Sequence, residues 1–587
     1  MVNNIFKSFL RKKRKKSLNG EINPEDIFLD SYNLAGLDMD KMEGALHKPI
    51  PSIAERIPFF VLLLIFSLFI FRLYSLQVKN FDLYKEKADN NRYNTHLILA
   101  NRGQILDRNG KILANNLVSS SSEILKRQYL EDSGISNLIG YVAYPKADSL
   151  GNYWQEEYKG RDGVEQIYQD ILSGVNGKKI IEKDVKSSIE AENIVVKPIS
   201  GANLNLAIDI DLQKRLFDSI REVVNNRGYV SGTGIIMDVN TGEILVMTTF
   251  PEYDNNLLTN ASGTADNKKI SNLLKDKRTP FLNRPVSGLF TPGSVVKPFM
   301  AYAALNEKVI TPEKNILSTG ALVIKNPYGG PDTVFKDWKI HGYINAVRAI
   351  AESSDEYFYQ VGGGYKDQKG LGIERIDEYA KLFGLSTTTG IDLPNEATGV
   401  IPTPDWKRIN FIDGDWKVGD TYHTSIGQYG FQVTPIELIR YIASIANGGK
   451  LVTPHVFLSA SSSDPDSPEN YLIESYNNKV WPVTDLNLNQ NNLKYVQEGM
   501  KQVVTNGTVP QLNFTNLKVA AKSGTAELGI VKGRVNSIIT GYFPYDNPKY
   551  SFTVIMENGK LSDSSGAVAA VKPVIEYISL NKDKYIK

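Results

Sequence analysis

Cysteine is absent from the 587 residues, and histidine occurs only five times. Without cysteine the chain can form neither disulfides nor thiolate metal sites. The histidines are scattered, and none belongs to an HExxH signature of a zinc hydrolase. The absence of cysteine and the scattered histidines argue against a metalloenzyme. They do not indicate the cellular compartment.

A strong net charge is also missing, since 67 basic and 65 acidic residues leave a net charge of +2. The chain as a whole is therefore not a binder of nucleic acid or of another polyanion. Its basic charge is local: the run Lys7–Lys16, KSFLRKKRKK, holds seven cations and no acid. A solvated tail and a nucleic-acid patch are two interpretations of such a run. We favour a third, a cytoplasmic membrane flank that contacts anionic lipid.

One long apolar run, residues 57–78, follows this basic segment and contains Arg72 as its only charge. Its length exceeds the ~20 residues that a membrane-spanning helix needs. A signal peptide fits less well, because the run begins late and no small-residue cleavage site follows it. A buried core helix is the remaining alternative. The sequence thus predicts a single-pass protein of the cell membrane, with a cytoplasmic N-terminus and an extracytoplasmic remainder.

The rest of the chain is too long for one hydrophobic core. Residues 1–56 read as a polar tail, and residues 79–202 mix short strands with glycine-bearing turns. Residues 203–587 read as strands, then a helical block, then strands again, which predicts an α+β domain with one antiparallel sheet. Within it, Thr233–Pro251 predicts a β-hairpin, and Ser459–Asn470 predicts a polar loop.

A serine and a lysine stand three residues apart in GLFTPGSVVKPF, at Ser294 and Lys297. Residues with this spacing share one face of a helix, so the two side chains can meet. A lysine held neutral can take the proton of a serine hydroxyl and make it a nucleophile. The pattern alone is weak, because it recurs by chance at Ser579–Lys582.

Two further motifs follow in order along the chain. ESSDEYFYQ contains Ser353 and Asp355, and VAAKSGTAEL contains the run Lys522–Thr525 on a predicted strand. A glycine in such a strand lets another backbone lie against it, and a lysine can bind a carboxylate. The ordered set of three motifs is specific, although each motif alone is not.

This set resembles the SxxK, SxN and K[ST]G motifs of penicillin-binding proteins and serine β-lactamases. The resemblance extends from Asn101 to the end of the chain. It includes RGQILDRNG and GRDGVEQIYQDILSG, which resemble the non-catalytic pedestal, or dimerisation-type, domain of class B penicillin-binding proteins. It implies a pedestal over residues 79–202 and a transpeptidase domain over residues 203–587.

Within class B, the chain is most similar to the elongation type, the penicillin-binding protein 2 group. The features are GLFTPGSVVKPF, Asp355 in the second motif, EYFYQ after it, and SIGQ before the third motif. Tyr429 departs from the family, because it stands where the family pattern SIGQG has a glycine. Some elongation-type members hold a metal through a cysteine beside the second motif. Ser354 occupies that place here, so we expect no metal, despite Asp337 and His341.

The resemblance implies that the enzyme cross-links peptidoglycan stem peptides through a serine acyl-enzyme. Ser294 would attack the D-Ala-D-Ala amide, with Lys297 as general base. Ser353 and Lys522 would carry the proton to the leaving amine, and Asp355 would orient Lys297. β-Lactams would acylate the same serine.

The third motif would supply the substrate-binding groups. The hydroxyls of Ser523 and Thr525 would bind the substrate carboxylate, and Gly524 would leave room for the substrate backbone. The backbone N–H groups of Ser294 and Thr525 would form the oxyanion hole. The reaction needs no cofactor.

The implied partners are a glycan polymerase of the SEDS family and scaffold proteins of the elongation machinery.

Four other functions remain open: a division-type class B transpeptidase, a D,D-carboxypeptidase or β-lactamase, a bifunctional synthase, and a catalytically silent cell-wall scaffold. Penicilloyl release would distinguish a lactamase, and failure to bind penicillin would favour the scaffold.

Overall fold

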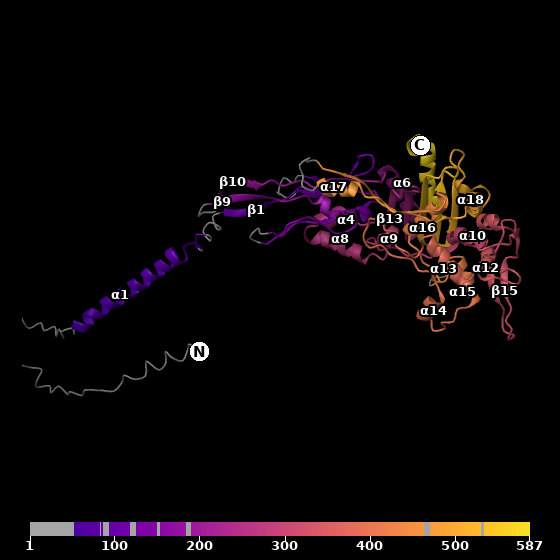
Figure 1. Cartoon of the computed structure of the whole chain (residues 1–587), viewed down its shortest axis with the longest axis horizontal. Helices are drawn as coiled ribbons and strands as arrows, with labels where there is room; N and C mark the ends of the chain where they lie inside the picture. The colour runs from indigo at the N-terminus through magenta and orange to yellow at the C-terminus, as the bar shows by residue number, and fades with distance from the viewer. Residues whose placement is uncertain are drawn as a thin grey trace, which may run out of the picture. The chain divides into compact units, whose positions relative to one another are not determined.

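The computed structural model describes residues 52–82, 84–85, 93–117, 125–148, 153–183, 189–462, 470–529 and 533–586. These residues belong to two compact units, 1–91 and 92–587 (Figure 1). The basic run and most of the predicted tail lie outside the described residues.

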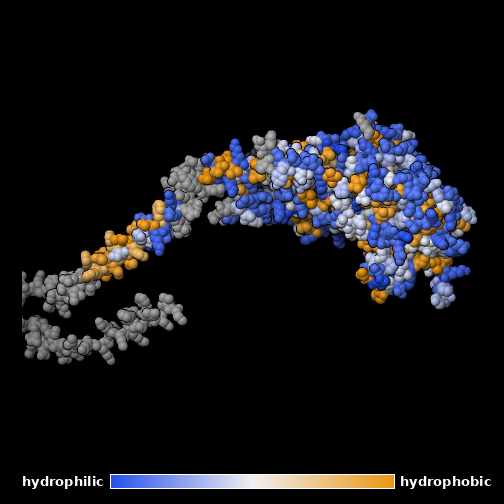
Figure 2. Space-filling view, in the orientation of Figure 1, coloured by the Kyte–Doolittle hydropathy of each residue, from blue (hydrophilic) through white to orange (hydrophobic). Residues whose placement is uncertain are grey.

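The described part of the first unit consists mainly of helix α1 (Ser52–Tyr74), which continues as a π-helical turn, η4 (Ser75–Lys79). The 22 residues Pro58–Lys79 are apolar enough to cross a membrane, and this stretch is 0% buried within the structure. Figure 2 shows the apolar surface of α1, where Leu62 is 65% exposed and Phe66 66% exposed. A helix with such a surface is stable in lipid rather than in water. The predicted apolar helix is therefore confirmed, and it fits a single-pass membrane anchor.

The N-terminal part of the second unit contains two sheets. A three-stranded antiparallel sheet has the order β1-β9-β10, and a five-stranded sheet has the order β19-β11-β2-β3-β4. The first sheet consists of β1 (Tyr93–Ile98), β9 (Gly177–Lys183) and β10 (Ile189–Val196). The second consists of β2 (Ile105–Leu106), β3 (Ile112–Leu117), β4 (Lys126–Tyr129), β11 (Asn203–Leu206) and β19 (Phe457–Ser461). Short elements fill the rest: α3 (Ser136–Ile139), β5 (Val142–Ala143), β6 (Lys146–Ala147), β7 (Tyr153–Gln155), β8 (Lys159–Gly160), α4 (Gly163–Ile167) and α5 (Gln169–Leu172).

The five-stranded sheet joins segments that are distant in the sequence. Strand β11 pairs in parallel with β2 and antiparallel with β19, so that Asn203 lies opposite Ser461. The prediction of a loop over Ser459–Asn470 is therefore wrong for its first three residues, which belong to β19, and for Asn470, which begins helix α17 (Asn470–Asn477); residues 463–469 lie outside the described residues. Polar composition indicated a loop, but pairing with a distant strand decided the structure.

The turn between β2 and β3 fastens this sheet to the following domain. The Asp107 carboxylate accepts hydrogen bonds from the backbone N–H groups of Asn109 (2.9 Å) and Lys111 (2.8 Å). It also accepts one from the N–H of Ile210 (3.2 Å), the first residue of helix α6 (Ile210–Arg227). The RGQILDRNG segment thus forms a turn between two strands and contacts the N-terminus of α6.

A buried charged triad holds two sequence segments of the pedestal together. Glu165 accepts hydrogen bonds from Arg102 Nε (2.6 Å) and Arg127 Nε (2.9 Å), and all three side chains are 0% exposed. Burial by itself would raise the pKa of the Glu165 carboxyl, but the two guanidiniums lower it below its usual range. The triad links RGQILDRNG to GRDGVEQIYQDILSG through charge compensation.

The C-terminal part contains one antiparallel five-stranded sheet of order β13-β12-β23-β22-β21. Its strands are β12 (Ser231–Asp238), β13 (Ile244–Phe250), β21 (Ala520–Glu527), β22 (Arg534–Phe543) and β23 (Tyr550–Lys560). Helices α6 and α19 (Gly566–Leu580) pack together and against this sheet, and α20 (Lys582–Tyr585) follows α19. The predicted hairpin over Thr233–Pro251 and the α+β fold are both confirmed.

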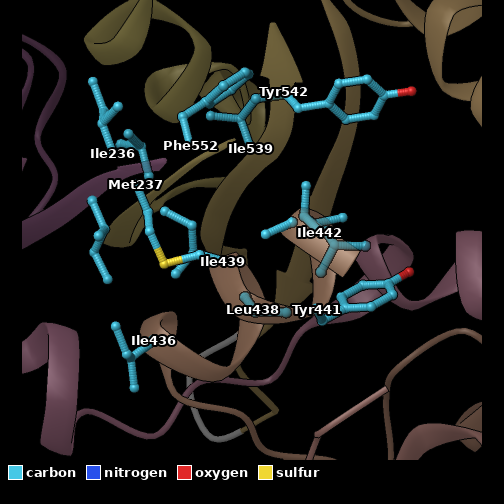
Figure 3. Close-up of a cluster of buried hydrophobic side chains, with 14 of the residues drawn as sticks. Ile236, Met237, Ile436, Leu438, Ile439, Tyr441, Ile442, Ile539, Tyr542 and Phe552 are labelled. Atoms are coloured by element: carbon cyan, nitrogen blue, oxygen red, sulfur yellow. The ribbon is translucent and has the colours of Figure 1, made fainter. Parts of the chain in front are cut away.

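Helix α16 (Pro435–Ala446) packs against β12, β22 and β23. It is buried along its whole length and begins with a capping box, in which Thr434 and Glu437 satisfy each other's backbone N–H groups. Figure 3 shows the apolar cluster that joins Ile439 and Ile442 of α16 to Met237 of the sheet. Burial of this helix fixes the sheet against the helical block.

The helical block lies between β13 and β21 in sequence (Figure 1). Its helices are α7 (Asn255–Asn260), α8 (Gly263–Lys275), α9 (Arg284–Ser287), α10 (Lys297–Asn306), α11 (Ala346–Glu352), α12 (Asp355–Gly363), α13 (Ile373–Leu382), α14 (Pro404–Asn410), α15 (Val418–Ser425), α17 (Asn470–Asn477) and α18 (Gln490–Thr505). Three short two-stranded antiparallel sheets complete it among the described residues: β14 (Ile316–Ser318) with β17 (Gly342–Ile344), β15 (Ala321–Ile324) with β16 (Thr333–Lys336), and β18 (Lys450–Val452) with β20 (Val483–Asp485).

The buried triad generates a stability prediction. We expect Glu165→Gln to lower the free energy of unfolding by about 3–5 kcal/mol, because it leaves two buried guanidiniums without an opposing charge. Chemical denaturation of the purified protein measures this difference. Asp546→Asn is the matched control, since it breaks a surface pair with Lys518 whose side chains are 64% and 63% exposed. A loss for Glu165→Gln no larger than for this control would contradict the prediction.

Candidate functional site

Ser294 lies in a 3₁₀ turn, η5 (Gly293–Val296), that leads directly into α10. The backbone N–H of Lys297 donates to the Ser294 carbonyl, which places both residues in one turn. Pro298 is tolerated because it lies at the start of α10, where its missing N–H has no helical partner to lose. Ser294 is partly exposed, whereas Lys297 is fully buried. The reactive candidate therefore faces solvent, and the amine lies behind it.

The Lys297 amine contacts the second motif. Its Nζ donates to Asp355 Oδ1 (2.6 Å), to the Ser353 carbonyl (2.8 Å) and to Ser353 Oγ (3.3 Å). Three oxygens thus fix an ammonium or amine group that has no contact with bulk water. Asp355 is the carboxylate that directly balances its charge.

Ser353 reaches this position through a left-handed backbone conformation. Its φ of 57° and ψ of 41° separate α11 from α12, and Ser354 then caps α12 by accepting from the N–H of Tyr357 (3.2 Å). A non-glycine residue in this region costs on the order of 1–3 kcal/mol, and such strain is frequent at functional sites. The strained turn directs Ser353 Oγ between two lysines.

The second of these lysines is Lys522, on the edge strand β21. Its Nζ donates to Ser353 Oγ (2.8 Å) and to the Ser523 carbonyl (2.8 Å), and its side chain is fully buried. Burial, followed by the positive charge of Lys297, lowers the pKa of Lys522 well below its usual range; Asp355 opposes this shift. One hydroxyl therefore joins two amines that repel each other when both are charged.

The rest of the KSGT run presents its groups alternately, as in any strand. Gly524 is buried on the side of Lys522, and a Cβ there would lie 2.7 Å from the Pro292 carbonyl oxygen. Ser523 Oγ lies 3.0 Å from Thr508 Oγ1, and Thr525 is exposed. Strand β21 can therefore approach the turn that precedes Ser294 only because residue 524 has no side chain.

The backbone of Gly293, the residue before Ser294, lies beside that of Thr525. A Cβ built on Gly293 would lie 3.1 Å from the carbonyl oxygen and 3.6 Å from the amide nitrogen of Thr525. Gly293 itself donates its N–H to the Gly427 carbonyl (2.9 Å) in the SIGQ segment. Three separate sequence motifs thus meet at one turn.

The structure brings Lys297, Ser353, Asp355 and Lys522 into one hydrogen-bonded network and places the turn of Ser294 beside Thr525. Two contributors were not found from the sequence. Thr508 contacts Ser523, and Trp338 donates its indole N–H to the Ser353 carbonyl (3.3 Å). Neither belongs to a recognisable motif, so a single sequence carries no signal for them.

The residues beside the second motif do not fit the family's metal site. Ser354 Oγ donates to Asp337 Oδ2 (2.7 Å), and the Glu356 N–H donates to the same oxygen (2.9 Å). His341 Nε2 lies 3.5 Å from that oxygen. A serine hydroxyl is not among the usual ligands of zinc, and here it is engaged as a donor to the carboxylate.

Comparisons with known proteins agree with this geometry. The model of the penicillin binding protein transpeptidase domain matches residues 232–576, and that of the penicillin-binding protein dimerisation domain matches residues 118–206. The peptidoglycan D,D-transpeptidase MrdA of Haemophilus influenzae is 28% identical over 622 residues, which cover 89% of this chain and 90% of that protein.

Two solved structures are also similar. PBP2 of Helicobacter pylori, in its complex with MreC, is 26% identical with a TM-score of 0.65, over 83% of this chain and 99% of that chain. A peptidoglycan synthase complex that coordinates polymerization and crosslinking contains a chain that is 26% identical with a TM-score of 0.67, over 89% of this chain and 98% of that chain. Since a transpeptidase domain spanning more than half of its residues follows a dimerisation domain, the chain belongs to the class B penicillin-binding proteins.

Proposed function

We propose that this protein is a peptidoglycan D,D-transpeptidase of the elongation type. The observation that carries the proposal is the hydrogen-bonded series Lys297–Ser353–Lys522 beside the partly exposed Ser294. This arrangement suits acyl transfer, because it can accept the proton of a serine and return it to a leaving amine. The similarity to MrdA, a peptidoglycan D,D-transpeptidase, supports the same reaction.

Ser294 is the proposed nucleophile. Its Oγ attacks the carbonyl carbon of the amide between the two terminal D-Ala residues, and its proton passes to Lys297. The C–N bond of the tetrahedral intermediate then breaks, and the leaving amine receives a proton through Ser353 and Lys522. An acyl ester on Ser294 remains, and the amine of a second stem peptide attacks it to form the cross-link and restore the hydroxyl.

Lys297 must be free of one proton to act as the base. Lys522, whose pKa is depressed, is the amine that loses its proton more readily in the resting arrangement. Ser353 Oγ contacts both amines, so it can donate its proton to Lys522 while it takes one from Lys297. Asp355 keeps the Lys297 amine in place through the 2.6 Å contact. Lys297, Ser353 and Lys522 together thus carry one proton fewer than in their fully protonated state.

The oxyanion of the tetrahedral intermediate is assigned to the backbone N–H groups of Ser294 and Thr525. The contact of the Thr525 backbone with Gly293, the residue before Ser294, supports this assignment. Each such donor is worth roughly 10²–10³ in rate. The Ser523 and Thr525 hydroxyls are assigned to the substrate carboxylate, and Gly524 leaves space for its backbone.

The proposed domain division is a tail to residue 56, an anchor over 57–78, a pedestal over 79–202 and a transpeptidase domain over 203–587. The proposed partners are stem peptides, β-lactams, a SEDS-family glycan polymerase and an elongation scaffold protein. The similar PBP2 in complex with MreC and the similar synthase complex support partners of these classes. The catalytic domain lies outside the cell membrane, where its substrate is.

The nucleophile is tested with a fluorescent penicillin. We expect the protein to form a covalent adduct and Ser294→Ala to form none, because the variant lacks the hydroxyl that accepts the acyl group. Ser579→Ala is the matched control, since it removes the serine of the second Ser-x-x-Lys sequence, in α19. Fluorescence in a denaturing gel measures both. Equal labelling of Ser294→Ala and the parent would refute the proposal.

The charge state of Lys522 is tested by Lys522→Met. We expect this variant to lose penicillin labelling and to unfold at a higher temperature than the parent at pH 7. Because the folded-state pKa of Lys522 is depressed, the unfolded chain binds more protons, and parent stability rises with pH between that pKa and 10.5. The advantage of the variant should therefore shrink by about 1.4 kcal/mol per pH unit in this window. A stability difference that does not change with pH would contradict the depressed pKa.

The membrane orientation is tested with single cysteines, because the parent has none. We expect a membrane-impermeant maleimide to label Ser262→Cys in intact spheroplasts and to label Ser17→Cys only after lysis. Ser262 is exposed in the structure, and Ser17 follows the basic run. Labelling of Ser17→Cys before lysis would reverse the proposed topology.

A further inference from the structure

The turn after α15 contains a strained aromatic residue. Tyr429 has a φ of 63°, in the left-handed region that bulky residues rarely occupy. Such a conformation persists only where surrounding contacts hold it, and it is frequent at functional sites. Tyr429 is also where the sequence departs from the glycine of the family pattern.

Phe411, Trp406 and Trp416 pack around the Tyr429 ring, and we call these four residues the aromatic cluster; the His423 ring also stacks on Tyr429, at 6.4 Å. Phe411 stacks on it at 5.8 Å with an interplanar angle of 12°. Trp406 and Trp416 meet it edge-on at 5.8 Å and 6.0 Å. Burial, followed by hydrogen bonding to Asp420, raises the pKa of the Tyr429 hydroxyl. The ring is therefore held on several sides.

The cluster is fastened to the helices on both sides of it. Trp406 belongs to α14, and its neighbour Lys407 donates to Asp420 Oδ2 of α15 (2.8 Å), with side chains only 6% and 12% exposed. The Lys407 amine also lies 6.0 Å from the centre of the Tyr429 ring. Tyr429 thus connects the turn after α15 to helices α14 and α15, which the Lys407–Asp420 ion pair holds together.

This turn contacts the residue that precedes the proposed nucleophile. The Gly427 carbonyl accepts from the Gly293 N–H (2.9 Å), and a Cβ on Gly427 would lie 2.3 Å from the Gly293 carbonyl oxygen. The two backbones are in direct contact, so a displacement of the turn displaces Gly293. Ser294 is the next residue in the chain.

We propose that Tyr429 is a positioning residue for Ser294. Its ring, held in the aromatic cluster, keeps the Gly427 turn pressed against Gly293 and thereby fixes the attack position of the Ser294 hydroxyl. The inference rests on the proposed role of Ser294 as nucleophile. The ring, rather than the hydroxyl, is the group that acts, because most of the contacts described are made by its faces and edges.

Acylation kinetics of the full-length protein test this role. A fluorescent penicillin acylates Ser294: the Ser294 Oγ–carbonyl bond forms, the lactam C–N bond breaks, and the serine proton passes to the lactam nitrogen. We expect Tyr429→Gly to lower the maximal acylation rate by about tenfold or more, as for a small misplacement of a reacting group. Its apparent dissociation constant for penicillin should stay within about threefold of the parent value. Tyr429→Phe keeps the ring, so its rate should also stay within about threefold.

Controls separate positioning from folding and from the proposed function. Lys308→Gly relieves the same kind of backbone strain (φ of 55°) at the far end of α10, and its acylation should match that of the parent. If Tyr429→Gly fails to fold, Tyr429→Asn replaces it in the test. Asparagine tolerates this φ and lacks the ring. An unlabelled parent overturns the proposed function. A labelled parent with unimpaired Tyr429→Gly, or equal impairment of Tyr429→Phe and Tyr429→Gly, overturns the inference alone.

Discussion

Two lysine amines share one serine hydroxyl in the interior of this protein, and the rest of the site is arranged around that contact. Lys297 and Lys522 both donate to Ser353 Oγ, at 3.3 Å and 2.8 Å, and both side chains are buried. Two buried ammonium groups so close together repel each other, and Asp355 carries the carboxylate that directly pairs with Lys297. This repulsion favours the state in which one of the two amines has lost a proton. A neutral amine is what the base in acyl transfer requires.

The fold supplies this contact from three distant segments. Helix α10 is buried around Lys297, the left-handed turn at Ser353 separates two helices, and the edge strand β21 places Lys522 opposite them. The small residue Gly524 allows the strand to meet the turn before Ser294. Backbone strain at Ser353 and burial of Lys522 both oppose stability, so packing elsewhere must offset them. Helix α16 and the central sheet provide that packing, as Figure 3 illustrates.

The sequence allowed prediction of features that depend on local pattern. The apolar run predicted α1, two β-rich runs around a short turn predicted the hairpin of β12 and β13, and the ordered motifs predicted the family. Features that depend on distant contacts were not predictable. Pairing of β19 with β11 made a strand of a polar segment, and the triad at Glu165 needed Arg102 and Arg127 to meet in space. Thr508 and Trp338 likewise contact the site without any motif to mark them.

The proposed mechanism depends on the protonation state of the Lys297 and Lys522 amines, and nitrogen NMR of lysine side chains measures it directly. With ¹⁵N-labelled lysine in the intact protein, we expect one neutral side-chain amine at pH 7. The Lys522→Met variant should lack the signal of this amine. Full protonation of both Lys297 and Lys522 at this pH would contradict this mechanism, because neither amine could then accept the serine proton.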